Sequence, residues 1–154
     1  MHKEYHFPTK ENICAIITSF NPDQGFYQRI LDVAKKVAKT IIIDNHSSSI
    51  IKNEIKDIFK IETNIQIIFN NCNYGIAKAL NQGIIKAKQE GFEFVFLLDQ
   101  DSIVSEKIID ILTGIYLNFQ ENDKIGLIGA GYTNSKTEKI DDNKSLYLFV
   151  NHLI

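Results

Sequence analysis

The sequence predicts an α/β fold in which a mostly parallel sheet is flanked by helices. Apolar runs of about five residues alternate with amphipathic segments of about fifteen, as in repeated β-α units around a parallel sheet. The runs are rich in β-branched residues, which favour strands over helices. No internal repeat, low-complexity segment or linker divides the 154 residues, so we expect a single domain over residues 1–154.

Composition and charge are those of an ordinary globular protein. Hydrophobic residues make up 44% of the chain and charged residues 23%, with a formal net charge of −2. Seventeen Lys and Arg are set against nineteen Asp and Glu, and the basic residues are scattered rather than gathered in a stripe with aromatic residues. We therefore expect no nucleic acid among the partners.

The N-terminal segment and the cysteines bear on location. Met1–His6 carries charges where a secretory signal needs an apolar stretch, and the later apolar runs are only about a strand long. The sequence therefore predicts a cytoplasmic protein without a transmembrane segment. Cys14 falls in an expected strand and Cys72 in an expected loop, without the C-x-x-C spacing of a zinc or redox site. Both are expected to be reduced, structural thiols.

The first strand and helix follow from local signals. Residues 13–18 form an apolar run that predicts a buried strand. Asn21 then offers an N-cap, Pro22 suits the first helical position, and Gln24 is placed to close a capping box. These signals predict a helix from about Pro22 to Ala38.

Two further strands follow. Thr40–Ile43 is too short and too β-branched for a helix, so we expect a second strand that ends at Asp44. The serines at 47–49 can cap the next helix. Ile65–Phe69 is the third expected strand, and the loop over residues 70–75 carries Asn and Gly, which tolerate left-handed backbone geometry.

The next helix and the strand after it have the clearest pattern. Ile76, Leu80, Ile84 and Ala87 are spaced for one helical face, and Gly91 supplies a C-terminal stop. An apolar run at residues 94–98 predicts a fourth, fully buried strand.

The rest of the chain is less regular. Ser105 can cap a helix that runs to about Phe119, and Ile125–Ile128 is a fifth expected strand. The remaining residues are polar, and only Leu146–Val150 has the pattern of a further strand.

Polar residues directly follow each of the first four expected strands. In an open parallel sheet, ligands bind beyond the carboxyl ends of the strands, so these residues would line one rim of the sheet. The four clusters are Thr18 to Asn21, Asp44 to Ser47, Asn70 to Gly75, and Asp99 to Asp101.

The Asp99-Gln100-Asp101 sequence is the sharpest of these features. Two carboxylates one residue apart in a tight turn can share a hard divalent cation with a diphosphate. Such pairs also arise by chance, and the position directly after a buried strand narrows that risk without deciding between a site and a cap. The alternative is a turn whose Asp and Ser side chains cap the next helix.

The other candidates also have structural alternatives. Asp44 could accept hydrogen bonds from a base or ribose, or it could form an Asx-turn or helix cap. Asn73 and Gly75 could contact a ligand or serve loop geometry. Asn81, inside an otherwise good helix beside the apolar stripe, needs a partner if it is covered. Gly83 suggests close packing against another backbone or a ligand.

Two other interpretations, a dinucleotide-binding domain and a phosphoacceptor receiver domain, fit the sequence less well. Residues 125–131 (I-G-L-I-G-A-G) are similar to the glycine-rich turn of dinucleotide-binding domains, but Asn134 stands where the third glycine is needed. We treat this segment as a strand and turn. A phosphoacceptor receiver domain would need an acidic pair after the first strand, where Thr18 and Ser19 stand.

Taken in order, these motifs resemble glycosyltransferase family 2. Asp-Gln-Asp-Ser after an apolar strand, together with the helix before that strand, is similar to the rhamnosyltransferase branch of the family. The resemblance runs from about residue 13 to 134. The segments that carry it are Thr18–Pro22, Ile43–Ser47, Asn71–Ile84 and Leu98–Ser102.

The resemblance implies a GT-A type nucleotide-binding fold, Mg²⁺ or Mn²⁺ as cofactor, and transfer with inversion at the anomeric carbon. Asp44 would contact the base, Asp99 would lie near the ribose and the metal, and Asp101 would ligate the metal. The other residues that would line the nucleotide-sugar pocket are Thr18, Phe20, Asn21, Asn73, Gly75 and Asn81.

The resemblance also implies dTDP-rhamnose or a similar nucleotide-sugar as the donor, and a saccharide acceptor in surface polysaccharide synthesis. That acceptor could be lipid-linked, and the protein could lie peripherally at the inner face of the membrane. Family members continue into an acceptor-binding region with the catalytic base, which we expect to be missing here. Asp141 and Asp142 lie in a polar stretch that predicts a loop, so no catalytic base is assigned. The alternative is a non-catalytic fragment that binds a nucleotide-sugar or a partner.

Overall fold

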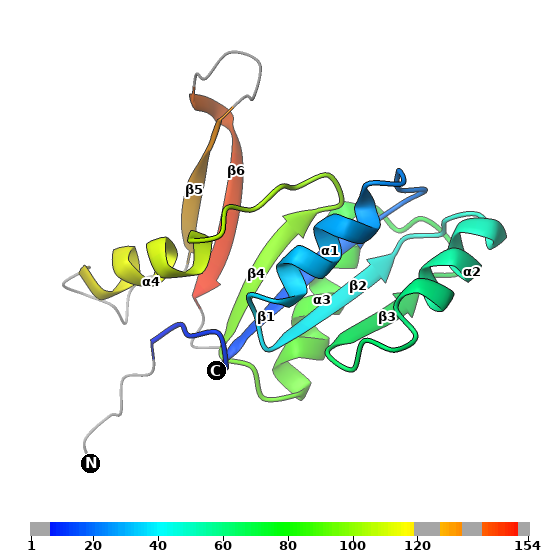
Figure 1. Ribbon diagram of the computed structural model, residues 1–154, viewed down its shortest axis with the longest axis horizontal. Coiled ribbons are helices and arrows are strands. Elements are labelled where there is room, and N and C mark those ends of the chain that lie inside the picture. Colours follow the sequence, from blue (N-terminus) through cyan, green and yellow to red (C-terminus); the bar gives the residue numbers. More distant parts are fainter. Residues whose placement is uncertain (1–6, 119–126, 134–139, 151–154) are drawn as a thin grey trace.

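The computed structural model describes residues 7–118, 127–133 and 140–150, and ten helices and strands lie within them (Figure 1). The strands are β1 (Ile13–Ser19), β2 (Lys39–Asp44), β3 (Ile65–Phe69), β4 (Phe94–Asp99), β5 (Leu127–Thr133) and β6 (Ile140–Val150). The helices are α1 (Phe26–Ala34), α2 (Ser49–Ile58), α3 (Ile76–Gln89) and α4 (Ile108–Asn118).

One six-stranded sheet has the order β3-β2-β1-β4-β6-β5. The first four strands pair in parallel, whereas β6 is antiparallel to both β4 and β5. The predicted α/β fold with a mostly parallel sheet is therefore confirmed. The chain runs outward from β1 to β3 and then returns to place β4 on the other side of β1. Ligands of open α/β sheets bind at such a reversal, beyond the carboxyl ends of the strands.

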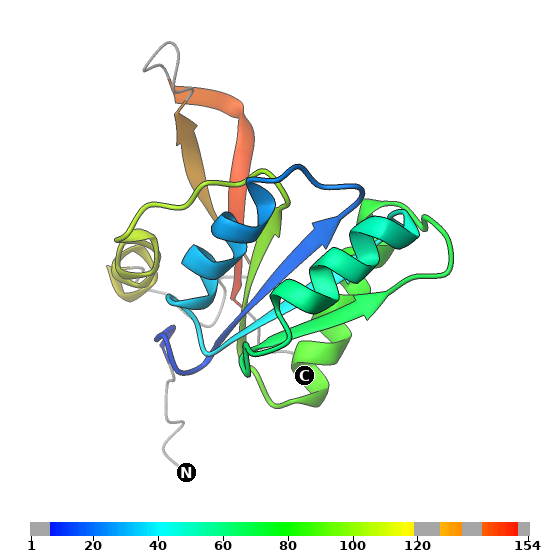
Figure 2. The same ribbon diagram turned by 45° about the vertical axis from the view of Figure 1, so that its right-hand side comes forward.

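Helices cover both faces of the sheet (Figure 2). Alternate residues of a strand point to opposite faces, and β1 divides its buried side chains accordingly. Ile13 and Ile17 pack with α1, α2 and α4, whereas Cys14 and Ile16 pack with α3. Because β1 is buried on both faces, it reads as one continuous apolar run rather than an alternating one.

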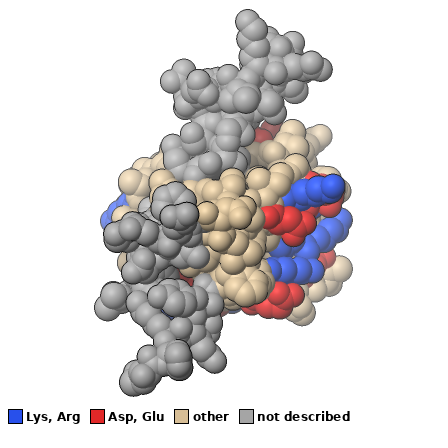
Figure 3. Space-filling view, turned by 90° about the vertical axis from the view of Figure 1, so that its left-hand side faces the viewer, with Lys and Arg blue, Asp and Glu red and all other residues tan. Residues whose placement is uncertain are grey.

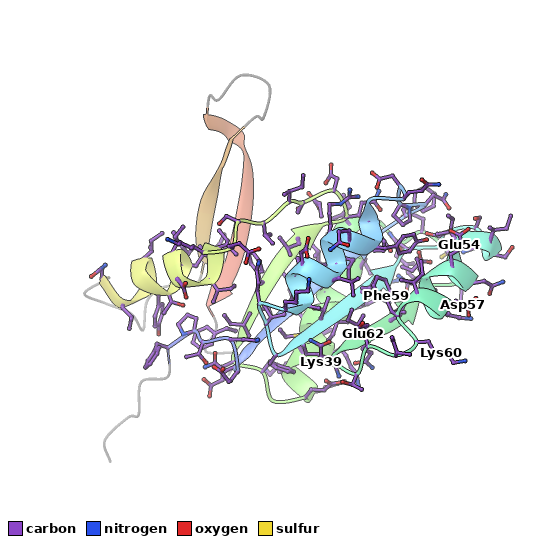
Figure 4. All side chains as sticks on the ribbon, in the orientation of Figure 1. Lys39, Glu54, Asp57, Phe59, Lys60 and Glu62 are labelled. Carbon is purple, nitrogen blue, oxygen red and sulfur yellow. The ribbon has the colours of Figure 1, made fainter. Side chains whose placement is uncertain are left out.

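Aromatic packing joins α1 to α2. Phe59, directly after α2, lies with its ring centroid 6.5 Å from that of Phe26 and 6.0 Å from that of Tyr27 (Figure 4). The Tyr27 hydroxyl donates a hydrogen bond of 3.0 Å to Glu54 of α2. These contacts join the helices that follow β1 and β2.

The opposite face depends on a close approach of α3 to β1. A Cβ atom added to Gly83 would lie 2.3 Å from Cγ2 of Ile16, which is too close for any side chain. The close packing predicted at Gly83 is present, but its partner is the side chain of Ile16 and not another backbone or a ligand.

Helix α4 carries several exposed apolar side chains. Figure 3, seen from that side, shows uncharged surface with acidic and basic side chains interspersed along one edge. Ile111, Ile115 and Leu117 are 51%, 44% and 53% exposed. Within the part of the chain that the structure describes, no helix combines the length and apolar character needed to cross a bilayer.

The predicted start of the first helix is wrong. Helix α1 begins at Phe26 rather than Pro22 and ends at Ala34, and Asn21 and Gln24 form no capping box at its start. Asn21 has a φ of 43° and bonds instead to the loop after β2. The carboxylate of Asp23 accepts the Phe26 amide at 3.0 Å and so ends the preceding loop.

Two other helix ends agree with the sequence and one does not. Ser48 caps α2 by accepting the Ile51 amide, and Gly91, at a φ of 86°, follows the end of α3 as expected. A cap at Ser105 predicted that the fourth helix starts directly after it, but α4 starts at Ile108. The Ser105 carbonyl, rather than its side chain, accepts the Ile108 amide. The predicted end at Phe119 lies outside the described residues.

The C-terminal strands also differ from expectation. Asp141 and Asp142 lie within β6 and not in a loop, because that strand starts at Ile140 and pairs along β5. Gly129 and Gly131 lie inside β5, which continues to Thr133, so the predicted turn there is wrong. A register irregularity follows Gly131. Polar residues in an antiparallel pair give a weaker signal than the apolar runs of buried parallel strands.

Candidate functional site

The sheet register brings three predicted site residues to one rim. Ser19 lies opposite Asp44 in the pairing of β1 with β2, and Thr18 lies opposite Asp99 in the pairing of β1 with β4. Thr18 and Asp44 are buried, whereas Asp99 is exposed. The carboxyl ends of these strands therefore meet at the reversal of strand order, where the sequence predicted a ligand.

Hydrogen-bond donors of Ser19 and Ser47 hold the Asp44 carboxylate. This carboxylate accepts the Ser47 amide at 3.0 Å, the Ser47 hydroxyl, and the Ser19 hydroxyl at 3.4 Å. The residue is 0% exposed. This geometry matches the capping alternative. A carboxylate has about four lone-pair positions, and these three hydrogen bonds use three of them. Contact with a base, which stays a prediction, would use the fourth.

The loop after β1 is tied to the loop after β2. The Asn21 amide donates to the Ser47 hydroxyl, and the Asn21 side-chain oxygen accepts the Ser48 amide, each at 2.8 Å. These bonds hold Asn21 at its positive φ. Phe20, next to it, is 47% exposed, so its ring is available to a ligand at the rim.

A network of amides that the sequence analysis did not assign supports the next loop. Asn45 donates to Asn73 Oδ1 at 2.8 Å and accepts the Tyr74 amide at 2.9 Å. Asn70 donates to Asn45 at 3.1 Å and exchanges two hydrogen bonds with Gln82 of α3. Asn45 and Asn70 are buried, and their polar side chains at strand ends were the available signal.

Asn73 and Gly75 shape the entry to α3. The Gly75 amide donates to Asn73 Oδ1 at 2.9 Å, and Gly75 has a φ of 81°, which favours glycine. Asn81 is exposed on α3, and it is the neighbouring Gln82 that joins the rim network. Asn81 is therefore not covered, so the expected need for a partner does not arise, and its contact with a ligand stays a prediction.

Asp99 and Asp101 are exposed side chains in a tight turn at the end of β4. Ser102 closes that turn, because its hydroxyl accepts the Asp99 amide and its amide donates to the Asp99 carbonyl, both at 3.1 Å. Among the described residues there is no group of three or more acidic, His or Cys side chains that could hold a metal. Two carboxylates suit Mg²⁺ or Mn²⁺ when substrate phosphates complete the coordination.

The two cysteines have different environments. Cys14 is buried between β1 and α3, and burial raises the pKa of its thiol to about 12. Cys72 is free and exposed in the loop before α3. The prediction of a structural thiol therefore applies to Cys14, whereas Cys72 packs into no core.

A cavity of about 590 Å³ lies between the N-terminal segment, the end of α1 and α4. Phe7, Lys36, Ile109 and Leu117 are among its lining residues, and it contains none of the predicted site residues. The candidate site is therefore the carboxyl rim and not this cavity.

Comparison with known proteins decides the family. The sequence profile of glycosyl transferase family 2 matches residues 14–150. The chain belongs to this family.

Two curated relatives extend this result. A dTDP-rhamnosyl transferase of Shigella flexneri, RfbF, is 31% identical over 115 residues, which are 74% of this chain and 37% of that protein. A poly-β-1,6-N-acetyl-D-glucosamine synthase of Staphylococcus aureus is 34% identical over 122 residues, which are 77% of this chain and 28% of that protein. The family 2 chain thus spans about a third of the length of these relatives. The predicted resemblance to rhamnosyltransferases is confirmed.

Solved structures share the fold. A mannosyltransferase of Pyrobaculum calidifontis, in complex with GDP-Man and Mn²⁺, superposes with a TM-score of 0.66 at 11% identity, over 96% of this chain and 48% of that one. GalNAc-T7 with UDP, GalNAc and Mn²⁺ gives a TM-score of 0.59 at 19% identity, over 74% and 22% of the two chains. These likenesses confirm the GT-A type fold of this family 2 chain.

Proposed function

We propose that this chain is the nucleotide-sugar-binding part of a metal-dependent glycosyltransferase. The observation that carries the proposal is the meeting of Thr18, Asp44 and Asp99 at the reversal of strand order, with the Asp101 carboxylate exposed beside them. A crevice at this point of an α/β sheet is where nucleotides bind.

The similarity to the dTDP-rhamnosyl transferase supports dTDP-rhamnose as the donor. The similarity to a synthase of an N-acetylglucosamine polymer makes a UDP-linked donor the main competitor. The name of the synthase, which makes a polysaccharide, supports a saccharide acceptor, and we propose that this acceptor belongs to surface polysaccharide synthesis. We further propose that transfer inverts the anomeric carbon, that the acceptor is lipid-linked, and that the protein works in the cytoplasm at the inner face of the membrane.

The rim residues divide the work of holding the donor. Phe20 offers an exposed ring for stacking on the base. Asn21 and Asp44 hold the loops after β1 and β2 in place. Asn73 and Gly75 line the side of the diphosphate, at the start of α3, and Thr18 forms the floor. Asn81 lies further along α3.

Asp99 and Asp101 would hold Mg²⁺ or Mn²⁺ together with the diphosphate oxygens. The bound metal would neutralise the charge that grows on the leaving diphosphate, which is stabilisation of the transition state. The chain's own contribution is to present two exposed carboxylates in a turn that Ser102 closes. No residue of the described part is assigned as the base that deprotonates the acceptor.

Calorimetric titration with dTDP, UDP and GDP, each with Mn²⁺ and with EDTA, tests the proposal. We expect one of the three diphosphates to bind at least ten-fold more tightly with Mn²⁺, about 1.4 kcal/mol. Preference for dTDP would support the rhamnosyl donor, and preference for UDP would replace it. Equal affinity of all three nucleotides with and without metal would overturn the function.

A further inference from the structure

Arg29 is the only arginine in the chain, and the other sixteen residues counted as Lys or Arg are lysine. Lysine therefore supplies the positive charge at every other position. An arginine differs from lysine in its planar fork of donors, which can reach two acceptors in fixed directions. Its single occurrence points to a position where geometry matters more than charge.

The guanidinium of Arg29 bridges two loops of the rim. Its Nε donates to the Gln100 carbonyl oxygen at 3.0 Å, and its Nη2 donates to Asp23 Oδ1 at 2.8 Å. The side chain is only 18% exposed although it projects from the first turn of α1. In Figure 2 the segment that leaves β4 crosses near the beginning of α1, where these contacts form.

Asp23 keeps this cation neutralised. The hydrogen bond from Arg29 holds the pKa of the Asp23 carboxyl below its usual value, which favours the carboxylate that balances the guanidinium. The same Oδ1 accepts the Phe26 amide. A paired guanidinium can thus anchor the loop after β4 without adding an uncompensated positive charge beside a divalent cation.

Gly25 leaves the space that the guanidinium occupies. A Cβ atom added there would lie 2.5 Å from Arg29 Nη1 and 3.2 Å from Asp23 Oδ1. Gly25 has a φ of −71°, which any residue can adopt, so the backbone does not require glycine here. What the missing side chain provides is room for Arg29.

Gln100 is held a second time, through its side chain. Its Oε1 accepts the Phe20 amide at 2.8 Å. The middle residue of the Asp99-Gln100-Asp101 turn is therefore fixed by both its carbonyl and its amide group, while the carboxylates on either side remain exposed. The turn is tied to the loop that carries Phe20 and Asp23.

We propose that Arg29 is a positioning residue for the metal-binding turn. Together with Gln100 and the space at Gly25, it holds the Asp99 and Asp101 carboxylates in place before a cation and a nucleoside diphosphate arrive. This inference rests on the proposed function. Without Arg29, the turn has to be ordered at the moment of binding, and that entropy cost weakens the metal-dependent part of the affinity.

The test compares Arg29→Met, Arg29→Lys, Gly25→Ala and the control Lys35→Met, which removes one exposed charge from the end of the same helix. Two quantities are measured on the whole chain. One is amide hydrogen exchange of residues 99–102 without ligand. The other is the Kd, with Mn²⁺ and with EDTA, of whichever of dTDP, UDP or GDP binds the wild type most tightly.

We expect Arg29→Met to speed exchange at 99–102 and to raise the Kd with Mn²⁺ by roughly ten-fold, the scale of a lost charge-assisted hydrogen bond. The Kd in EDTA should change by less than about two-fold, because the turn holds the metal. Arg29→Lys should give partial rescue, since one ammonium cannot reach both acceptors. Gly25→Ala should shift both quantities in the same direction with no change of charge, and Lys35→Met should shift neither.

Unchanged exchange in both Arg29→Met and Gly25→Ala would overturn the role of Arg29 whatever the nucleotide results. An equal loss of affinity with Mn²⁺ and with EDTA would also overturn it, because general destabilisation acts on both. If the wild type binds no diphosphate in a metal-dependent way, the proposed function fails and the metal-directed role fails with it, while faster exchange would still show that Arg29 orders the turn.

Discussion

Thr18 and Asp99 are direct partners in the parallel pairing of β1 with β4. Thr18 is buried, at 8% exposure, whereas Asp99 is exposed, so the buried core of the sheet ends at this pair and the rim begins. Because the strand order reverses between these two strands, the helices that follow them leave the ends of the strands uncovered there.

Replacing Asp101 should remove metal-dependent binding without unfolding the protein. Asp101 is exposed and packs no core, so Asp101→Ala should leave the urea midpoint unchanged while the advantage of Mn²⁺ over EDTA in nucleotide affinity disappears. Calorimetry and urea titration measure the two effects. Asp57→Ala, which removes an exposed carboxylate from α2, is the matched control. If Asp101→Ala kept the metal dependence of binding, Asp101 would not ligate the metal, and the alternative that the turn only caps the next helix would stand.

Replacing Asp44 should act on the nucleotide whether or not metal is present. Asp44→Ala removes the acceptor for the Ser47 amide and two hydroxyls, so both the loop after β2 and the proposed base contact are lost. We expect weaker binding by a similar factor with Mn²⁺ and with EDTA.

Ser47→Ala separates the two roles of Asp44. That variant removes the hydroxyl that donates to Asp44 and accepts the Asn21 amide, so it loosens the loops and leaves the carboxylate in place. If Ser47→Ala weakens nucleotide binding as much as Asp44→Ala does, the carboxylate acts through the loop alone. If Asp44→Ala leaves affinity untouched, the base contact is excluded.

Two glycine-to-alanine changes should have opposite effects on stability. Gly83→Ala brings a methyl group to 2.3 Å from Ile16 and should destabilise the fold by about 1–3 kcal/mol through overpacking. Gly114→Ala in α4 meets nothing within 4 Å and should stabilise it by about 0.5–1 kcal/mol through helix propensity. Urea unfolding measures both.

Ile16→Ala checks the cause of the first effect. If the clash between the new methyl group and Ile16 is responsible, the double variant Gly83→Ala, Ile16→Ala should lose less stability than the sum of the single changes. Strict additivity would assign the loss at Gly83 to something other than this contact.

The Cys14 thiol should make the fold sensitive to alkali. Burial raises its pKa from an ordinary 9.0 to about 12. Between pH 9 and 12 the unfolded chain releases this proton while the folded chain keeps it, so stability is complete below pH 9 and falls as the pH rises through that window. Cys14→Ala should flatten this fall, measured by urea unfolding at a series of pH values.

Thiol labelling gives an independent check. At pH 8 the exposed Cys72 should react with a disulfide reagent and the buried Cys14 should not, until denaturant is added. Cys72→Ser should therefore show no rapid labelling. Rapid reaction of that variant in the native state would mean that Cys14 is not protected.

Local sequence determined most of the fold. The apolar run Ile13–Ile17 and its counterparts in β2 and β4 are buried on both faces, whereas the run of the edge strand β3 is half-buried. Continuous apolar runs of that length have few other stable conformations. The polar residues that end these strands placed Asp44, Asp99 and Asp101 at one rim, because parallel strands align their carboxyl ends.

Only the tertiary structure decided what holds that rim together. Asn21 has the sequence of a helix cap, yet its side chain bonds to Ser48, because a loop neighbour supplied a donor that local propensity does not include. Asp141 has the sequence of a loop and lies in a strand, because pairing with β5 overrides its preference. Arg29 and Gln100 are 71 residues apart, and their contact depends on where two strands and a helix pack. Sequence pattern records which residues are buried and where strands end, whereas contacts between distant loops arise only when the chain has folded.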